Sequence, residues 1–254
     1  MVLVALIAVG LAACGGDDED TAAQTTTTED PVANQKRDYC DKSLQVETAQ
    51  PPPGLFEAPP AQQKELVKQF ASQILPLGEE AQRIAPPEIK TDIDVLVGAT
   101  RTLSQSGDFR AFGQPNFEAA EQRVHVYDLQ NCGWKRVDVA GVDYAFQGIP
   151  QTLAAGPTSF ELANKASKED HELAVLRIND DVKEPFADIV KQGEQARQKV
   201  RPVGQAEAEP GKTEYAVVKL EPGRYAVSCF IPVGGREDGP PHAARGMFAE
   251  FTVS

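Results

Sequence analysis

The sequence predicts two domains, an α-helical domain followed by a β-sandwich, and three observations lead to this prediction. The chain has 254 residues, which is enough for one or two domains with a sizeable core. Apolar residues recur at steps of three and four between residues 36 and 134, as on one face of a helix. From Lys135 onward they alternate with polar residues, as in strands that bury one face. We therefore assign residues 36–134 to the helical domain and residues 135–254 to the sandwich.

Four helices are expected in the first domain. The apolar pattern places them at residues 38–46, 70–84, 89–103 and 117–131. Pro76 should kink the second helix, and Pro86 and Pro87 suit the start of the third. Short connections rich in Pro and Gly favour an antiparallel four-helix bundle. His125 lies beside the apolar stripe of the last helix, and we expect it to be solvated.

The second domain is expected to be a β-sandwich with a helical insertion. Alternating pairs such as Val137 with Val139 and Tyr225 with Val227 mark short strands, and Pro–Gly turns separate them. Residues 181–200 break this alternation and are predicted to form one or two helices. Trp134 and Tyr144 flank the junction and are expected to pack the two domains together.

The first residues resemble the export signal of a bacterial lipoprotein. Residues 1–13 form an apolar run that is too short to span a membrane but suits a signal peptide. Cys14 follows two alanines and precedes two glycines, as in the lipobox, so we expect it to carry the lipid that anchors the protein to a membrane. No Lys or Arg precedes the run, so we expect the natural start upstream. Residues 14–35 are acidic and rich in Thr, and are predicted to be a disordered tether.

The net charge excludes some partners. The sequence has 25 Lys and Arg against 38 Asp and Glu, a net charge of −13. Nucleic-acid binding and electrostatic attachment to anionic lipid both need a surplus of basic residues. We therefore expect no nucleic-acid partner, and we expect any membrane attachment to depend on the lipid at Cys14.

The cysteine count predicts one disulfide and one free thiol. Export to an oxidising compartment permits disulfides, and Cys14 is assigned to the lipid. In an up-and-down bundle the start of the first helix and the end of the fourth lie at the same end, so Cys40 is predicted to pair with Cys132. Cys229 is left over, and an unpaired thiol in an exported protein needs an explanation.

The remaining soft and borderline metal ligands gather in the second domain. His171 begins a predicted strand, Cys229 lies near the end of the strand 223–231, and Met247 opens the last strand, with His242 on the loop before it. All three strand residues are in phase with buried neighbours. Two imidazoles and a thiolate with a weak thioether are the ligand set of a blue copper site.

These residues and their order resemble the cupredoxins, the family of plastocyanin, azurin and sulfocyanin. The resemblance covers Val137 to Val253 and rests on the segments 160–164, 171–173, 223–229 and 241–247. It implies a cupredoxin-like β-sandwich in which His171, Cys229 and His242 are equatorial copper ligands and Met247 is the axial one. Twelve residues separate Cys229 from His242, and we expect the Pro and Gly residues among them to close the extra length as a surface excursion. The helical domain resembles, in composition alone, the small bundles of actinobacterial lipoproteins.

Two functions remain open at this point. The first is a membrane-anchored extracytoplasmic copper protein with a single type 1 site, which exchanges electrons or copper with a protein partner and catalyses no reaction. The second is a metal-free interaction lipoprotein, in which Cys229, His171 and Met247 have structural roles. Zinc on Cys229, His171 and His242 is a lesser alternative to copper. No nucleophile elbow frames Ser228, so we expect no hydrolase.

Overall fold

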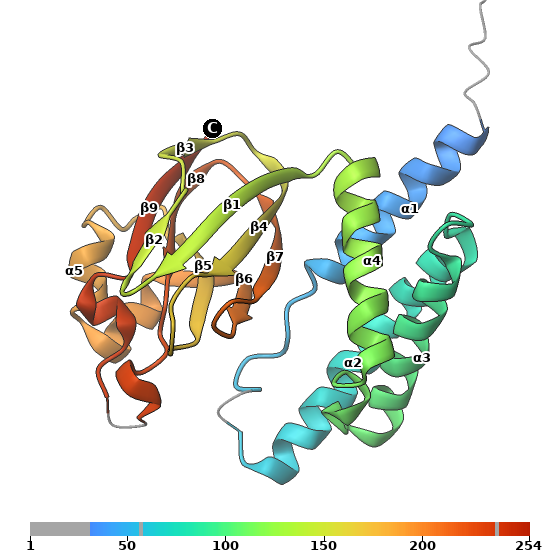
Figure 1. Cartoon of the computed structure of the whole chain (residues 1–254), viewed down its shortest axis with the longest axis horizontal. Coiled ribbons are helices and arrows are strands. Elements are labelled where there is room, and N and C mark those ends of the chain that lie inside the picture. The colour runs from blue at the N-terminus through green and yellow to red at the C-terminus, as the bar shows by residue number, and fades with distance from the viewer. Residues whose placement is uncertain (1–30, 56–57, 237–238) are drawn as a thin grey trace, which may run out of the picture.

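The computed structural model describes residues 31–55, 58–236 and 239–254, and shows a helical domain followed by a β-domain (Figure 1). The predicted signal peptide, Cys14 and most of the predicted tether lie outside the described residues. The helices of the first domain are α1 (Pro31–Glu47), α2 (Pro60–Ile84), α3 (Lys90–Ser106) and α4 (Pro115–Asn131). None of the helices in the described ranges has both the length and the hydropathy that a membrane span requires.

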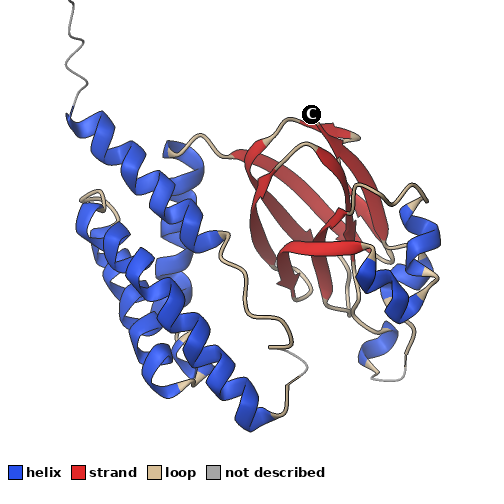
Figure 2. Cartoon of the chain, turned by 180° about the vertical axis from the view of Figure 1, so that it is seen from behind, coloured by secondary structure: helices blue, strands red, loops and turns tan. Residues whose placement is uncertain are grey.

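The helices pack side by side and bury the apolar stripes that the sequence predicts (Figure 2). α2 contacts α1 and α3, and α3 contacts α4. Their shared core includes Tyr39, Ala81, Ile93, Val97 and Val124. The predicted disulfide between Cys40 and Cys132 is confirmed, and it joins α1 to the end of α4 with the two Cα atoms 5.3 Å apart.

Two helices begin earlier than predicted. Residues 31–35 are the first turns of α1, so the tether predicted for residues 14–35 is wrong in its last part. Ala33, Gln35 and Lys36 favour helix, and the Gln35 side chain donates to the Ile84 carbonyl at the end of α2 (3.2 Å). α2 likewise starts ten residues before Phe70 and continues through Pro76. Polar, exposed first turns carry little apolar signal, which explains both errors.

Two sheets form the second domain. The smaller sheet has the order β2-β1-β4-β7 and the larger one the order β3-β9-β8-β5-β6. Most neighbours are antiparallel, but β1 pairs with β4 and β3 with β9 in parallel. The strands are β1 (Lys135–Val142), β2 (Ala145–Gln147), β3 (Thr152–Leu153), β4 (Gly156–Asn164), β5 (His171–Ile178), β6 (Val200–Ala208), β7 (Thr213–Leu220), β8 (Gly223–Ser228) and β9 (Phe248–Val253).

The core lies between the sheets, and the predicted alternation accounts for it. Val139, Phe160, Leu173, Val227 and Phe251 are buried there. β5 is apolar on both faces because its outer face, with Leu176 and Ile178, is covered by the predicted helical insertion. That insertion consists of α5 (Phe186–Val190) and a 3-10 turn (Gly193–Gln198). β6 and β7 were not predicted, and they are edge strands of the larger and the smaller sheet respectively.

The expectation that His125 is solvated was wrong, because this side chain is buried at the contact between the domains. It is 2% exposed, and its Nε2 lies 2.8 Å from Oε1 of Glu161 on β4. The ring stacks on Tyr215 of β7 with 3.4 Å between the centroids. Ser159 donates to the same Glu161 carboxylate (2.6 Å). Burial by itself would raise the pKa of Glu161. The hydrogen bonds from His125 and Ser159 stabilise the charged carboxylate, and the net effect is a lowered pKa.

Candidate metal centre

Three neighbouring strands of the larger sheet bring the candidate ligands to one end of the sandwich. His171 is the first residue of β5, Cys229 directly follows β8, and Met247 directly precedes β9. β8 lies between β5 and β9 in the sheet. The strand predicted for residues 223–231 therefore ends at Ser228, and the last strand begins one residue after Met247. Both strands are shorter than predicted because the regular pairing of β8 with β9 ends at Ser228 and Phe248, directly beside the site.

The loop between Cys229 and Met247 holds His242 in place by backbone hydrogen bonds. The Cys229 N–H donates to the Met247 carbonyl (3.1 Å), and the Ala243 N–H donates to the Cys229 carbonyl (2.8 Å). His242 opens a 3-10 turn (His242–Arg245) that ends at Gly246 with φ 102°, a value that favours glycine. The residues between Cys229 and His242 were predicted to loop out at the surface. An antiparallel bridge between Pro232 and Pro241 brings the two ends of this excursion together.

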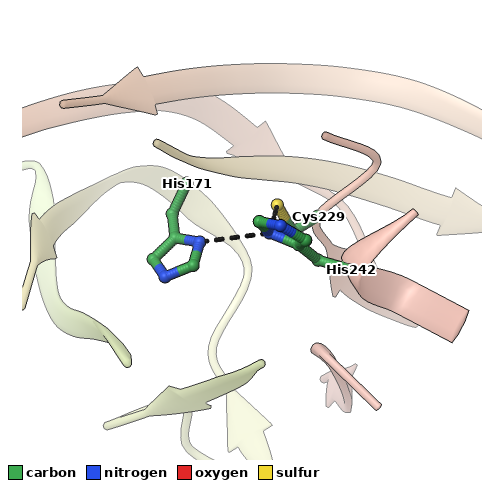
Figure 3. Close-up of side chains that lie close together, drawn as sticks. All are labelled: His171, Cys229 and His242. Atoms are coloured by element: carbon green, nitrogen blue, oxygen red, sulfur yellow. Dashed lines mark hydrogen bonds between the residues drawn. The ribbon is translucent and has the colours of Figure 1, made fainter. Parts of the chain in front are cut away.

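The side chains of His171, Cys229 and His242 converge (Figure 3). Nδ1 of His242 lies 3.3 Å from Nδ1 of His171 and 3.3 Å from Sγ of Cys229. All three residues are at most 1% exposed. A metal with bonds of about 2.0–2.3 Å in a trigonal plane needs donors about 3.5 Å apart, so these separations match a shared ion. The sequence thus predicted a set of residues that the fold does bring together.

Met247 is buried beside this cluster. It is 0% exposed, and its backbone carbonyl accepts from Cys229. Its N–H donates to the His242 carbonyl (3.1 Å). The backbone therefore places Met247 next to two of the three converging residues, and its role as an axial ligand stays a prediction.

Burial controls the protonation of the donor atoms. Burial raises the pKa of the Cys229 thiol to about 11, although backbone N–H groups of Glu172 and Ile231 counteract it by donating to the sulfur. The Glu172 N–H lies 3.3 Å from Sγ. Burial, together with the neighbouring His242, lowers the pKa of His171. A neutral imidazole at His171 is ready to ligate, whereas the Cys229 thiol has to release its proton when a metal binds.

Gly141 on β1 makes room for His171. A Cβ atom on Gly141 would lie 3.1 Å from Cδ2 of the His171 ring, which is closer than side chains normally approach. The smaller sheet therefore approaches the site with its backbone. This glycine carries no recognisable motif, and only the packing of the two sheets reveals its role.

Two residues near His242 were not predicted as part of the site. Glu169 on the β4–β5 connection accepts from Nε2 of His242, with 2.7 Å between Nε2 and Oε2. Tyr144 was expected to pack the domains together, and that expectation was wrong. Its ring lies edge-on to His242 at 5.1 Å between centroids, and its hydroxyl donates to Glu169 (3.1 Å). The Glu169-Asp170-His171 sequence was the available signal, since a carboxylate two residues before a strand-start ligand reaches the same end of the sheet.

The donor set fits copper. Two imidazole nitrogens, one thiolate and a buried thioether nearby are the combination that separates blue copper sites from oxygen-rich or all-sulfur sites. Nδ1 of His171 is the ring nitrogen that faces His242, whereas its Nε2 is buried and has no hydrogen-bond partner among the described residues. Two packed sheets and this buried cluster are both features that the resemblance to the cupredoxins implies.

Solved structures that include two auracyanins and a copper-containing nitrite reductase are similar to about half of this chain. Reduced auracyanin from the photosynthetic bacterium Roseiflexus castenholzii is 16% identical, covers 47% of this chain and 97% of its own, and gives a TM-score of 0.33. Auracyanin A from Chloroflexus aurantiacus, a "blue" copper protein, is 15% identical and gives a TM-score of 0.32. The match covers 48% of this chain and 100% of auracyanin A. A copper-containing nitrite reductase from Thermus scotoductus is 10% identical and gives a TM-score of 0.27. The match covers 47% of this chain and 31% of the reductase. No family model and no curated protein matches the sequence.

Proposed function

We propose that this protein is an extracytoplasmic electron carrier with one type 1 copper site. The observation that carries the proposal is the convergence of His171, Cys229 and His242 in a buried, preformed cluster. Copper in such a site supplies a one-electron Cu(I)/Cu(II) couple. His171 and Cys229, from two neighbouring strands, and His242, from one short turn, would hold the copper, and these buried side chains would need little rearrangement when it gains or loses an electron.

The chain itself contributes donor strength and rigidity. The backbone N–H of Glu172 donates to Sγ of Cys229, and hydrogen bonds at the thiolate tune the potential of such sites. The Glu172 carboxylate in turn accepts from the Phe230 N–H (2.9 Å), which fixes the backbone on both sides of the thiol. Phe230 is 44% exposed and covalently adjoins Cys229, so it offers a partner a contact near the metal.

We further propose that Cys14 is lipidated and anchors the protein to the outer face of the cell membrane. The apolar run before Cys14 and the two alanines preceding it support this. The disulfide between Cys40 and Cys132 also suits an oxidising compartment. The helical domain, which we propose to be an antiparallel four-helix bundle, would lie between the anchor and the copper domain along the chain.

A copper titration tests the function. Purified protein given Cu(II) should develop an intense visible thiolate-to-copper band with one equivalent bound. Cys229→Ala should abolish this band, and His171→Ala should abolish or strongly alter it. His125→Ala is the matched control, because this third histidine contacts Glu161 at the domain contact and should leave the band unchanged. Wild-type protein that stays colourless and binds no copper would instead favour the metal-free interaction lipoprotein, while a colourless Zn²⁺ complex would favour zinc.

A further inference from the structure

The outer edge of the His242 imidazole is closed by a carboxylate. Oε2 of Glu169 lies 2.7 Å from Nε2 of His242. The His242 side chain is 0% exposed and the Glu169 side chain is 29% exposed, so the carboxylate covers the ring and faces solvent with its other side. Nε2 of His171 has no such partner in the ranges that the structure describes. The two imidazoles of the cluster therefore differ in their surroundings.

The fold holds this carboxylate in a fixed position. Tyr144 donates to Oε1 (3.1 Å), and the backbone N–H of Gly234 donates to Oε2 (3.1 Å). The loop that carries Glu169 is itself tied down by Asn164, whose side chain donates to the carbonyls of Glu169 (2.9 Å) and Ala208 (2.8 Å). Asn164 is 0% exposed, so this support is part of the sandwich interior.

We propose that Glu169 is a positioning residue that fixes His242 in the tautomer with its proton on Nε2 and makes Nδ1 a stronger donor. The second part of this proposal rests on the proposed copper function. A carboxylate that accepts from the distal nitrogen of a metal-binding histidine fixes the ring orientation and raises its basicity. A stronger donor beside a negative charge favours Cu(II) over Cu(I). Glu169 thus lowers the reduction potential of the site, and Tyr144 supports it.

The first test uses the copper-free protein. Nitrogen-15 NMR of the imidazoles should show His242 of the wild type with the proton on Nε2 and no proton on Nδ1. Glu169→Ala should convert this single tautomer to a mixture. Asp170→Asn is the matched control, because it removes a carboxylate next to Glu169 that makes no hydrogen bond to an imidazole within the described part of the chain, and it should leave the tautomer unchanged. A proton on Nδ1 in the wild type, or an unchanged tautomer in Glu169→Ala, would overturn the proposal.

The second test uses the copper-loaded protein. Glu169→Gln keeps an oxygen acceptor but removes the charge, so the ring orientation should survive while the ratio of Cu(II) to Cu(I) affinity falls about tenfold. For one electron this equals a rise of about 59 mV in the reduction potential. Glu169→Asp should recover part of the shift, and Asp170→Asn should shift the potential much less. An unchanged potential in Glu169→Gln with the visible band intact would refute the effect on the metal. If the wild type binds no copper, the proposed function fails, and the NMR result still decides the tautomer.

Discussion

Removing the disulfide between Cys40 and Cys132 should destabilise the helical domain by a predictable amount. The bond joins residues 92 positions apart. The loop-closure entropy of a cross-link of this span is about 4.6 kcal/mol at 25 °C, and measured values for disulfides fall at about 2–4 kcal/mol because the unfolded state and native strain intervene. We therefore expect the double variant Cys40→Ala/Cys132→Ala to lose about 2–4 kcal/mol.

Urea unfolding measures this loss. Trp134, the one tryptophan of the sequence, lies two residues after Cys132 and is 6% exposed, so its fluorescence reports on the end of α4. With a slope of about 2–3 kcal/mol per M of urea, the midpoint should fall by roughly 1 M. Wild-type protein in a strong reductant is the control and should unfold like the double variant. The copper band depends on Cys229 and should persist in the variant under native conditions.

Two results would refute this reasoning. The first is a loss of stability below about 1 kcal/mol, which would mean that opening the disulfide loop adds almost no entropy to the unfolded chain. The second is peptide mapping under non-reducing conditions that finds Cys229 bonded to Cys40 or Cys132. That result would also remove the free thiol on which the copper site depends.

Three further predictions concern stability, the site and the anchor. Burial, with the nearby charge of Asp128, raises the pKa of Glu47 from 4.5 to about 8, so the folded protein retains a proton that the unfolded chain loses, and stability should fall as the pH rises between these values. Glu47→Gln should therefore gain about 1–3 kcal/mol over the wild type at pH 9 and almost nothing at pH 4, as measured by urea unfolding, and parallel pH profiles would contradict this. Gly141→Ala should push against the His171 ring and weaken or shift the copper band, whereas an identical titration would show that the ring has room to move. Cys14→Ser should abolish lipidation and move the protein out of the membrane fraction, and wild-type protein recovered unmodified in the soluble fraction would contradict the anchor.

The order and type of the residues were enough to predict the change from helices to strands and the cluster of His171, Cys229 and His242. The change of period at Lys135 predicted where the helices end and the strands begin, because burial of one face imposes a period on each element. The one unpaired cysteine, two histidines and the internal methionine of the second domain indicated the cluster. Their residue types define the chemistry, and their places at strand ends and on one loop limit where they can lie.

Only the tertiary structure decided what surrounds those ligands. Tyr144 and Gly141 reach the site from other parts of the chain, and their sequence neighbourhoods carry no periodic or motif signal. Glu169 stands two residues before His171, but only the fold shows that its carboxylate reaches His242. His125 was misassigned for the same reason, since a polar side chain beside an apolar stripe can be buried only if another element supplies its partner, here Glu161. Periodicity records which face of an element is buried. It does not record which element covers that face, and that is determined by how the two sheets and the helices pack.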